Sequence, residues 1–418
     1  MKILVFADVY PPLSGGSQVI LHEICSRLPA RSLLVYTSPV PGDRNFDLQQ
    51  PFRIVRSDMM RPLTSHWPEI PEADRMAMAR ADFYCRWFPR SRLVRWLVYV
   101  RVVRDMVRAA RRERADVILC GHPFLAAVAA RCHRWMRGVP YAVYSYGEEL
   151  AMLARRRGLA WRLQRWALQR AFAVFAISRF SGDVVLAFGV NPARVHVQCP
   201  GVSEVFFGEP TQSPVDVKRS LGVAADAPVV LTAARLMERK GVDTVIRALP
   251  EVLRASPTAV YLVAGTGADE ARLRRLTEEL GLKSRVRFLG DASHEALVNY
   301  YHACDVFVMP NRGVEETGET ETFGVVFLEA NACGKPVIGG RVGGVLDAIE
   351  DGESGLLVDP TDVQAVATAI VRFLNDPEYA RQVGERGRRR ARERFSWDRN
   401  AAEVLQTLTA AACASRVS

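Results

Sequence analysis

The apolar residues of this chain occur in short runs, and a helical pattern of apolar and polar residues follows most of them. Up to about residue 201 the runs are "KILVFAD", "SLLVYTS", "FRIVRSD", "DVILCGH", "YAVYSYG", "AVFAIS" and "VHVQCPG". A second series contains "VVLTAAR", "AVYLVAG", "VRFLG", "VFVMP", "PVIGG" and "GLLVD". Apolar strands that alternate with amphipathic helices are typical of a parallel sheet covered on both faces. The pattern therefore predicts two doubly wound, Rossmann-like α/β domains.

A more polar stretch that contains prolines separates the two series and predicts the domain boundary. We expect a first domain over residues 1–202 and a second over residues 203–396, joined near residues 203–227. The tail beyond residue 375 predicts two helices with a break at "FSW". Ligands of open parallel sheets bind beyond the carboxyl ends of the strands, so we expect the functional groups to follow strands directly.

The net charge of +10 is distributed unevenly along the chain. Residues 1–205 contain 30 Lys and Arg against 16 Asp and Glu, whereas the remainder contains 26 against 30. A basic half indicates an anionic membrane surface, an anionic substrate or a nucleic acid, or else arginines that are simply solvated.

Cysteine usage and the amino terminus indicate the compartment. No two of the eight cysteines have a C-x-x-C spacing, and several lie in apolar runs, which favours reduced thiols. The stretch "MKILVFADVY" does not resemble a signal peptide, because its apolar run is short and Asp8 ends it. No apolar run is long enough to span a bilayer. We expect a cytoplasmic protein, soluble or peripheral at the inner face of the membrane.

Two segments that follow predicted strands suit an anionic ligand. Gly15 and Gly16 precede a helix, where glycine allows close approach of the backbone and free N–H groups attract an anion. In the second domain, Arg235 and Lys240 follow the first strand and suit a diphosphate. Each segment alone is equally consistent with an ordinary turn at the surface.

The stretch "ETETFGVVFLEANACGKPV" places Glu321 in a loop before a predicted helix and Glu329 inside that helix. A carboxylate accepts two hydrogen bonds from a vicinal diol, so one glutamate suits a ribose and the other a hexose. The N–H groups of Phe323 and Gly324, together with the helix dipole, would face the phosphates between them. Acids that only stabilise the helix terminus would explain Glu321 but not Glu329. The segment therefore predicts a sugar nucleotide as ligand.

The stretch "ETFGVVFLEANACGKPVIGGRVGGVLDAIEDGESGLLVDP" resembles the nucleotide-binding signature of retaining glycosyltransferase family 4, which has the two-domain GT-B fold. The resemblance extends to "PPLSGGSQ", "ARLMERKGVD", "AISRFSGD" and "PGV", and so covers nearly the whole chain. It implies two Rossmann-like domains that face each other across a cleft. It also implies that the last helix, near residues 397–413, packs back on the first domain.

The same resemblance implies roles for particular residues. Glu329 would hold the donor ribose, Glu321 the transferred sugar, and Arg235 with Lys240 the diphosphate. Gly16 would let the first domain close over the phosphates. The donor-binding residues implied in full are Gly15, Gly16, Arg235, Lys240, Glu321, Thr322, Phe323, Gly324 and Glu329. The acceptor would be a small-molecule glycan, a polysaccharide or a lipid-linked glycan, and no nucleic acid would bind.

No cofactor or metal is implied, and the chain has no Asp-x-Asp motif for a metal. Fixed cations and helix dipoles can supply the same electrostatic stabilisation. Retention would proceed by front-face attack, with the leaving phosphate as the base.

The chain departs from the family where many members carry a histidine after a middle strand of the first domain. Here the residue is Tyr146, which donates one hydrogen bond but is a poor proton acceptor at neutral pH. His122 also follows a strand and is a second candidate, although a capping or structural role explains it slightly better. The missing histidine gives some weight to a nucleotide-sugar-binding module without catalysis. A different enzyme on the same fold, such as a nucleotide-sugar epimerase, is the other alternative to a glycosyltransferase.

Two basic segments bear tryptophan. The first predicts a helix whose apolar stripe is Leu93, Trp96, Val100, Val103, Val107 and Ala110. The second carries Trp161 and Trp166, flanked by Arg155, Arg156, Arg157, Arg162 and Arg165. Basic amphipathic helices with tryptophan can lie on anionic membranes. Packing of the apolar stripe on the sheet is the better explanation for the first segment, and for the second both explanations stand.

Overall fold

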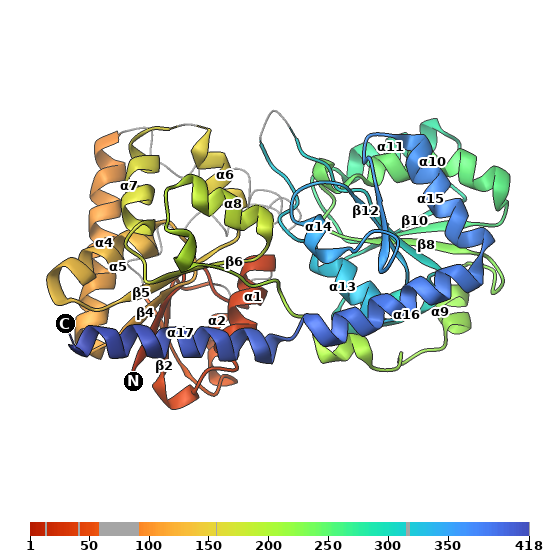
Figure 1. Ribbon diagram of the computed structural model, residues 1–418. Coiled ribbons are helices and arrows are strands. Elements are labelled where there is room, and N and C mark those ends of the chain that lie inside the picture. The colour runs from red at the N-terminus through yellow and green to blue at the C-terminus, as the bar shows by residue number, and fades with distance from the viewer. Residues whose placement is uncertain (13–14, 41, 58–91, 156, 315–317, 418) are drawn as a thin grey trace. The chain divides into compact units, whose positions relative to one another are not determined.

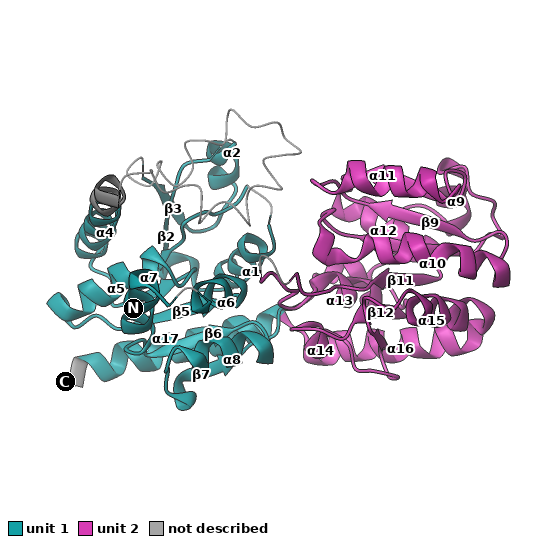
Figure 2. Cartoon of the chain, turned by 90° about the horizontal axis from the view of Figure 1, so that it is seen from above, with its two compact units in different colours: residues 1–70, 78–200, 397–418 teal, residues 71–77, 201–396 magenta. Residues whose placement is uncertain are grey.

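The computed structural model describes residues 1–12, 15–40, 42–57, 92–155, 157–314 and 318–417. The chain divides into two compact units (Figure 2). Of the described residues, unit 1 contains those within 1–57, 92–200 and 397–417, and unit 2 contains those within 201–396. Each unit is a parallel sheet covered by helices (Figure 1).

The described strands of unit 1 lie in the order β3-β2-β1-β4-β5-β6-β7, and all pair in parallel. They are β1 (Ile3–Phe6), β2 (Leu33–Thr37), β3 (Arg53–Arg56), β4 (Val117–Cys120), β5 (Tyr141–Ser145), β6 (Ala173–Ala176) and β7 (Val195–Val197). The helices are α1 (Gly16–Cys25), α2 (Asp43–Leu48), α4 (Arg92–Glu113), α5 (Leu125–Arg137), α6 (Glu148–Ala154), α7 (Leu159–Leu168), α8 (Arg179–Ala187) and α17 (Trp397–Val417).

The described strands of unit 2 lie in the order β10-β9-β8-β11-β12-β13, also in parallel. They are β8 (Val229–Ala233), β9 (Val260–Ala264), β10 (Val286–Gly290), β11 (Val306–Met309), β12 (Val337–Gly340) and β13 (Gly355–Val358). The helices are α9 (Pro214–Ser220), α10 (Val242–Ala255), α11 (Glu270–Glu279), α12 (His294–Ala303), α13 (Val325–Ala332), α14 (Val345–Ala348), α15 (Val363–Asn375) and α16 (Pro377–Arg394). Two short 3-10 helices are η5 (Glu204–Phe207) and η6 (Glu238–Lys240).

Every apolar run named from the sequence forms a strand, and the fold is the α/β architecture that they predict. The stretch 203–227, where we expected the two domains to be joined, belongs to unit 2. It contains η5 and α9 and packs within unit 2, where Phe206 is buried and contacts the Tyr301 ring edge-on at 5.9 Å. The apolar side chains Phe206, Phe207 and Val217 explain this, since all three are buried.

The apolar stripe predicted for α4 is wrong in part. Val102 and Met106 are fully buried, whereas Val100 is 53% exposed. The side chains of Leu93 and Trp96 lie outside the described residues. Val107 and Ala110 of the predicted stripe are buried as expected, but the centre of the buried face lies nearer to Val102 and Met106. Neighbouring elements that the sequence pattern does not contain decide which side of the helix is covered.

The last helix, α17, lies on unit 1 and contacts α1, β4 and β5. Its Val404 and Leu408 side chains are fully buried. Asn400 donates a hydrogen bond to the Cys199 carbonyl at 2.7 Å, and Arg27 binds the Asp398 carboxylate at 2.7 Å. Within the described part of the chain, no helix combines the length and the apolar composition that crossing a membrane requires.

Candidate active site

In each unit the sheet reverses its winding direction between two neighbouring strands, and their carboxyl ends form a crevice there. In unit 2 these strands are β8 and β11. Arg235 and Lys240 follow β8, whereas Asn311 and Glu321 follow β11. The fold therefore brings cations and a carboxylate from distant parts of the sequence to one edge of the sheet.

Glu321 is 7% exposed and its carboxylate is surrounded by donors. Lys240 forms an ion pair with it through Nζ, and Asn311 Nδ2 donates a hydrogen bond at 3.0 Å. These donors offset the cost of burying a carboxylate. The sequence assigns Lys240 to the phosphate and Glu321 to the sugar. In this structure the two side chains are bound to each other.

Arg239 is a site residue that the sequence reasoning missed. Its side chain is 1% exposed, and its guanidinium lies 3.9 Å from the carboxylates of Glu319 and Glu321. It also donates a hydrogen bond to the Thr320 carbonyl at 3.2 Å. A basic residue directly before Lys240 was the available signal, but the sequence alone does not tell that both adjacent cations reach the same carboxylate.

The glycines of "GGRVGG" hold the loop that carries Glu321. The Gly344 N–H donates to the Glu321 carbonyl at 3.0 Å, and a Cβ on Gly344 would lie 1.8 Å from the Thr322 carbonyl oxygen. Gly343 has a positive φ of 51°, and a Cβ on it would lie 2.3 Å from the Glu321 carbonyl oxygen. The glycine pairs were visible in the sequence, but their role depends on a contact that only the fold supplies.

A Gly344→Ala substitution is therefore expected to displace the loop with Glu321 and Thr322. Overpacking of this kind typically costs about 1–3 kcal/mol, so the melting temperature should fall and donor affinity should weaken. The control is Gly281→Ala, a position where a Cβ would meet nothing within 4 Å, although its φ of 68° carries a conformational cost of its own. Unchanged donor affinity in Gly344→Ala, measured by calorimetry, would show that this contact does not position the site.

The start of α13 offers backbone donors to an anion. Gly324 precedes the helix with a φ of 89°, a conformation that side chains other than glycine rarely adopt. Phe323 is 2% exposed and packs against Phe395, which anchors the turn, while Thr322 is partly exposed. The Phe327 N–H donates to the Gly324 carbonyl at 3.1 Å, whereas the N–H groups that precede it at a helix start have no carbonyl partner in the helix and so favour a phosphate.

Glu329 lies within α13 and has different partners from Glu321. The Tyr301 hydroxyl donates a hydrogen bond to its carboxylate at 3.0 Å. Burial raises the pKa of Glu329 to about 7, which the Tyr301 hydrogen bond only partly opposes. The carboxyl group is therefore close to half ionised at neutral pH, and further hydroxyl donors would shift it to the charged form.

In unit 1 the corresponding crevice lies between β1 and β4, which are neighbours in the sheet. Asp8 and His122 follow these strands at equivalent positions, since Phe6 pairs with Cys120. Both are buried, and Asp8 Oδ1 and His122 Nδ1 have no hydrogen-bond partner among the described residues. Burial raises the pKa of Asp8 to about 6 and lowers the pKa of His122 to about 4. His122 is therefore neutral at pH 7.

Tyr146 is 5% exposed. Its hydroxyl group donates a hydrogen bond to the carbonyl oxygen of Ser17, in the first turn of α1, at 3.1 Å. Burial raises its pKa well above the usual value. Its ring lies 5.1 Å from the His122 ring. Tyr146 thus connects β5 to the turn formed by Gly15 and Gly16, where the N–H of Val19 donates to the Gly15 carbonyl at 3.0 Å.

No group of three metal-binding side chains occurs among the residues that the structure describes.

Two Rossmann-like units, each with polar groups at the switch point of its sheet, are the architecture of the GT-B fold. The solved structure of Anabaena HepE in complex with UDP has this fold, with a TM-score of 0.76, 20% identity, and coverage of 98% of this chain and 100% of that chain. The family model described as "Glycosyl transferases group 1" matches residues 216–390. The model described as "Glycosyl transferase 4-like domain" matches residues 15–201. The chain belongs to this family, glycosyltransferase family 4, and is an enzyme that uses a nucleotide sugar.

Curated relatives match nearly the whole chain. The GDP-mannose-dependent monoacylated alpha-(1-6)-phosphatidylinositol monomannoside mannosyltransferase of Corynebacterium glutamicum is 33% identical and covers 95% of each chain. The GDP-mannose-dependent alpha-(1-6)-phosphatidylinositol monomannoside mannosyltransferase of Mycolicibacterium smegmatis is 29% identical over 97% of this chain and 98% of its own. The D-inositol 3-phosphate glycosyltransferase of Acidothermus cellulolyticus is 36% identical but matches 53% of this chain and 49% of its own.

Proposed function

We propose that the enzyme transfers mannose from GDP-mannose to a phosphatidylinositol mannoside, with retention of anomeric configuration. The observation that carries the proposal is the similarity over nearly the full length to two enzymes named for this donor and acceptor. The half-length relative is named for an inositol phosphate, a group that phosphatidylinositol also contains.

The donor would bind at the switch point of unit 2 and rearrange its charges. Glu329 would accept hydrogen bonds from the ribose, and Glu321 would accept them from the transferred sugar. Lys240 would leave Glu321 for the diphosphate, where Arg235 and the N–H groups before α13 also contribute. Because Asn311 and Arg239 stay beside Glu321, its carboxylate remains compensated after Lys240 moves.

In the transfer step, the bond from the anomeric carbon to the diphosphate oxygen breaks as the bond to the acceptor hydroxyl oxygen forms on the same face. The hydroxyl proton passes to the leaving phosphate oxygen. Arg235, Lys240 and the α13 terminus stabilise the charge that develops there, without a metal ion or cofactor.

The acceptor would bind at the switch point of unit 1. His122 is neutral, so Nδ1 or Nε2 accepts a hydrogen bond from a hydroxyl group, depending on the tautomer. The free oxygen of Asp8 serves the same purpose. The hydroxyl group of Tyr146 already donates a hydrogen bond to the Ser17 carbonyl, so we assign Tyr146 to positioning the first turn of α1 rather than to contact with the sugar.

The deciding experiment is an assay of the purified enzyme with GDP-mannose or UDP-glucose and with three acceptors: phosphatidylinositol monomannoside, phosphatidylinositol and D-inositol 3-phosphate. We expect mannose transfer to the mannoside, an α linkage by NMR, and no effect of a metal chelator. Transfer from UDP-glucose alone, a β product or preference for the inositol phosphate would refute the corresponding part of the proposal.

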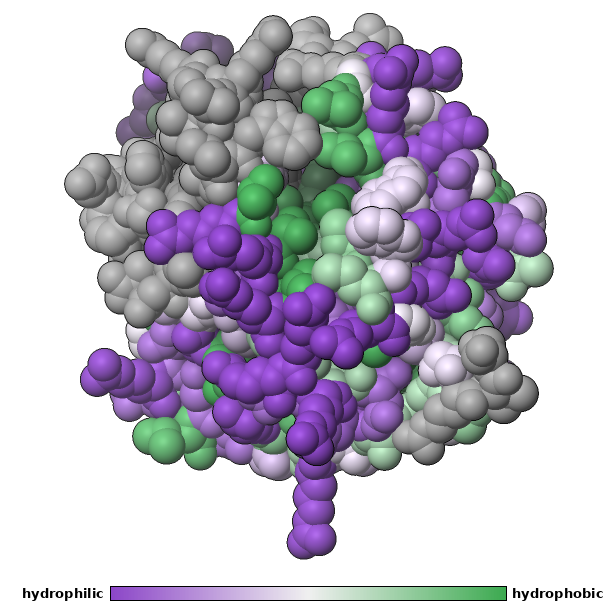
Figure 3. Space-filling view, turned by 90° about the vertical axis from the view of Figure 1, so that its left-hand side faces the viewer, coloured by the Kyte–Doolittle hydropathy of each residue, from purple (hydrophilic) through white to green (hydrophobic). Residues whose placement is uncertain are grey.

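We also propose that unit 1 docks on anionic membranes through the region around α7. Trp166 is 40% and Leu159 56% exposed, and Arg162 and Arg165 are exposed beside them. Trp161 is not available as an anchor, because it packs against Phe188 at 5.8 Å. Arg156 lies outside the described residues. The side of unit 1 drawn in Figure 3 is largely hydrophilic around a smaller apolar area.

Vesicle co-sedimentation should therefore increase with anionic lipid and fall at high salt, since each basic residue near such a surface contributes about 1 kcal/mol. Replacing Arg162, Arg165 and Trp166 together should weaken vesicle binding about tenfold or more. Replacing the exposed Arg274, Arg341 and Arg389 of unit 2 is the control. Binding that ignores lipid charge would refute this docking surface.

A further inference from the structure

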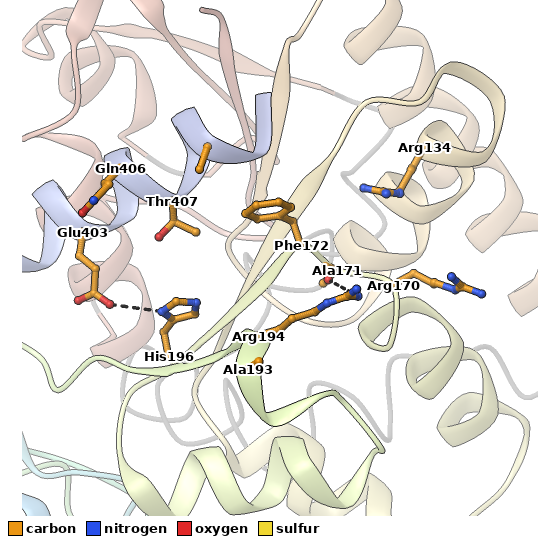
Figure 4. A pocket seen from close by; sticks show the side chains of 11 residues that line it. Arg134, Arg170, Ala171, Phe172, Ala193, Arg194, His196, Glu403, Gln406 and Thr407 are labelled. Carbon is orange, nitrogen blue, oxygen red and sulfur yellow. Dashed lines mark hydrogen bonds and ion pairs between the residues drawn. The ribbon is translucent and has the colours of Figure 1, made fainter. Parts of the chain in front are cut away.

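A groove in unit 1 lies at the sheet edge opposite the crevice with Asp8 and His122. It has a volume of about 610 Å³ and opens between α17 and the loops that precede β6 and β7 (Figure 4). Its lining residues are Arg134, Arg170, Ala171, Phe172, Ala193, Arg194, His196, Glu403, Gln406, Thr407 and Ala410. None of the residues assigned to the donor or the acceptor is among them. The volume is in the range of small-molecule sites.

The groove carries three arginines that come from three separate segments. Arg134 belongs to α5, Arg170 follows α7 and Arg194 precedes β7. In the described part of the chain, no carboxylate lies within ion-pair distance of any of them. The lining contains one acid, Glu403, which lies 3.5 Å from His196 Nδ1 and is directed to that ring (Figure 4).

Contacts with the backbone hold one of these cations in place. Arg194 donates hydrogen bonds to the carbonyl oxygens of Gln169 at 3.4 Å and Ala171 at 3.3 Å. In Figure 4 its side chain runs along the groove, and the Arg134 guanidinium points toward the Phe172 ring, whereas Arg170 extends outward at the rim. Arg194 is therefore positioned before any ligand arrives, which lowers the entropic cost of binding.

The chemistry of these groups favours phosphate. Guanidinium forks match the oxygens of a phosphate group and bind it more strongly than neutral donors do. Thr407 and Gln406 on α17 add a hydroxyl and an amide donor, and Phe172 supplies an apolar wall. Like charges around one cavity repel each other, and a bound anion removes that repulsion.

We propose that the groove formed by Arg134, Arg170 and Arg194 is a second anion site, which binds a phosphate-bearing ligand and is separate from the donor diphosphate site in unit 2. The ligand is either a soluble polyphosphate or sugar phosphate, or the headgroup of an anionic phospholipid. The proposal does not depend on the identity of the sugar or the acceptor.

Calorimetry with tripolyphosphate tests the site directly. In a background that carries Arg235→Ala and Lys240→Ala, which weakens binding at the donor site, one binding event should remain. Adding Arg134→Gln, Arg170→Gln and Arg194→Gln should weaken it about tenfold or more. The matched control changes three exposed arginines of unit 1, Arg31, Arg104 and Arg108, to glutamine. Equal weakening in both triple variants, or binding that neither changes, overturns the proposal.

Folding of the groove variant is checked by circular dichroism and thermal melting. If loss of the Arg194 contacts unfolds the protein, the Arg134→Gln and Arg170→Gln double variant replaces it. Neither of these side chains has a hydrogen bond or ion pair within the described structure. The double variant should still weaken tripolyphosphate binding several-fold, and unchanged binding would again overturn the proposal.

Vesicles of phosphatidylcholine, with or without phosphatidic acid, distinguish the two sources of phosphate. If the ligand is a lipid headgroup, the groove variant loses affinity for the acidic vesicles as well as for tripolyphosphate. If the ligand is soluble, the variant loses tripolyphosphate binding only. If the groove variant binds tripolyphosphate and the acidic vesicles with the same affinity as the Arg31, Arg104 and Arg108 control variant does, neither source of phosphate is correct.

Discussion

Replacing Lys240 with alanine is expected to reduce kcat about a hundredfold or more. Removal of one preorganised donor to a developing negative charge typically costs about 10²–10³ in rate. In the free enzyme Lys240 is bound to Glu321, and in the donor complex it would neutralise the diphosphate. The loss should therefore fall on kcat, because the charge on the leaving phosphate is greatest in the transition state.

The melting temperature separates this effect from a structural one. Lys240→Ala leaves the buried Glu321 with Asn311 and Arg239, so we expect a modest decrease. Lys283→Ala is the control, because Lys283 is an exposed unit 2 lysine in a surface pair with Glu278. A Lys240→Ala enzyme that melts far below the wild type but keeps its specific activity would contradict the phosphate assignment. Arg235→Ala should behave like Lys240→Ala.

Glu329→Gln is expected to weaken donor binding about tenfold or more at pH 8. A hydrogen bond to a charged group contributes about 1.5–3 kcal/mol, and the amide replaces the ionised acceptor. The pKa of Glu329 is raised to about 7 in the free enzyme. Ribose hydroxyl groups would favour the ionised form, so the bound donor should lower this pKa.

Donor binding should therefore release part of a proton at pH 7. Affinity should increase as the pH rises from 6 through 7 and level off near pH 8, because the free carboxyl group is then already ionised. Calorimetry of a nucleotide sugar in buffers of different ionisation enthalpy measures the proton directly. In Glu329→Gln both the release and the pH dependence should disappear, whereas Glu278→Gln, an exposed control, should retain them.

The same pKa makes a prediction about stability. A carboxyl group whose pKa is raised on folding stabilises the folded state below about pH 4.5, and this contribution is lost as the pH rises through about 7. The melting temperature of the wild type should therefore fall relative to that of Glu329→Gln between pH 5 and pH 8. An identical pH profile for the two proteins, together with unchanged donor affinity, would exclude Glu329 as the ribose ligand.

Most of the fold could be predicted from the sequence, because each strand is a local apolar run. Candidate site residues could be named from the sequence only where one residue has a distinctive setting. Glu329 is unusual within its helix, and its assignment to the ribose stays a prediction. Arg239 was not named, since its contacts are with Glu319 and Thr320, which are distant in sequence.

The same limit applies to the tryptophans and to the tyrosine. Trp161 and Trp166 have similar basic surroundings in the sequence. In the structure Trp161 packs against Phe188, whereas Trp166 is partly exposed. Tyr146 stands where the resemblance places the family histidine, and its contact with Ser17 could not be read from residues that lie 129 positions apart. Local pattern determines elements, whereas long-range packing determines which side chains of an element are available.

The contact of α17 with unit 1 affects the order in which the two units can fold during synthesis of the chain. Residues 201–396 are an insertion within unit 1, because the segments on either side of them fold together. Unit 2 can therefore complete its core while the ribosome still holds the end of the chain, but unit 1 waits for Val404 and Leu408. A premature stop codon shortly before residue 397 would leave unit 2 intact. Unit 1 would lack α17, and the apolar surface that α17 covers would be exposed to chaperones.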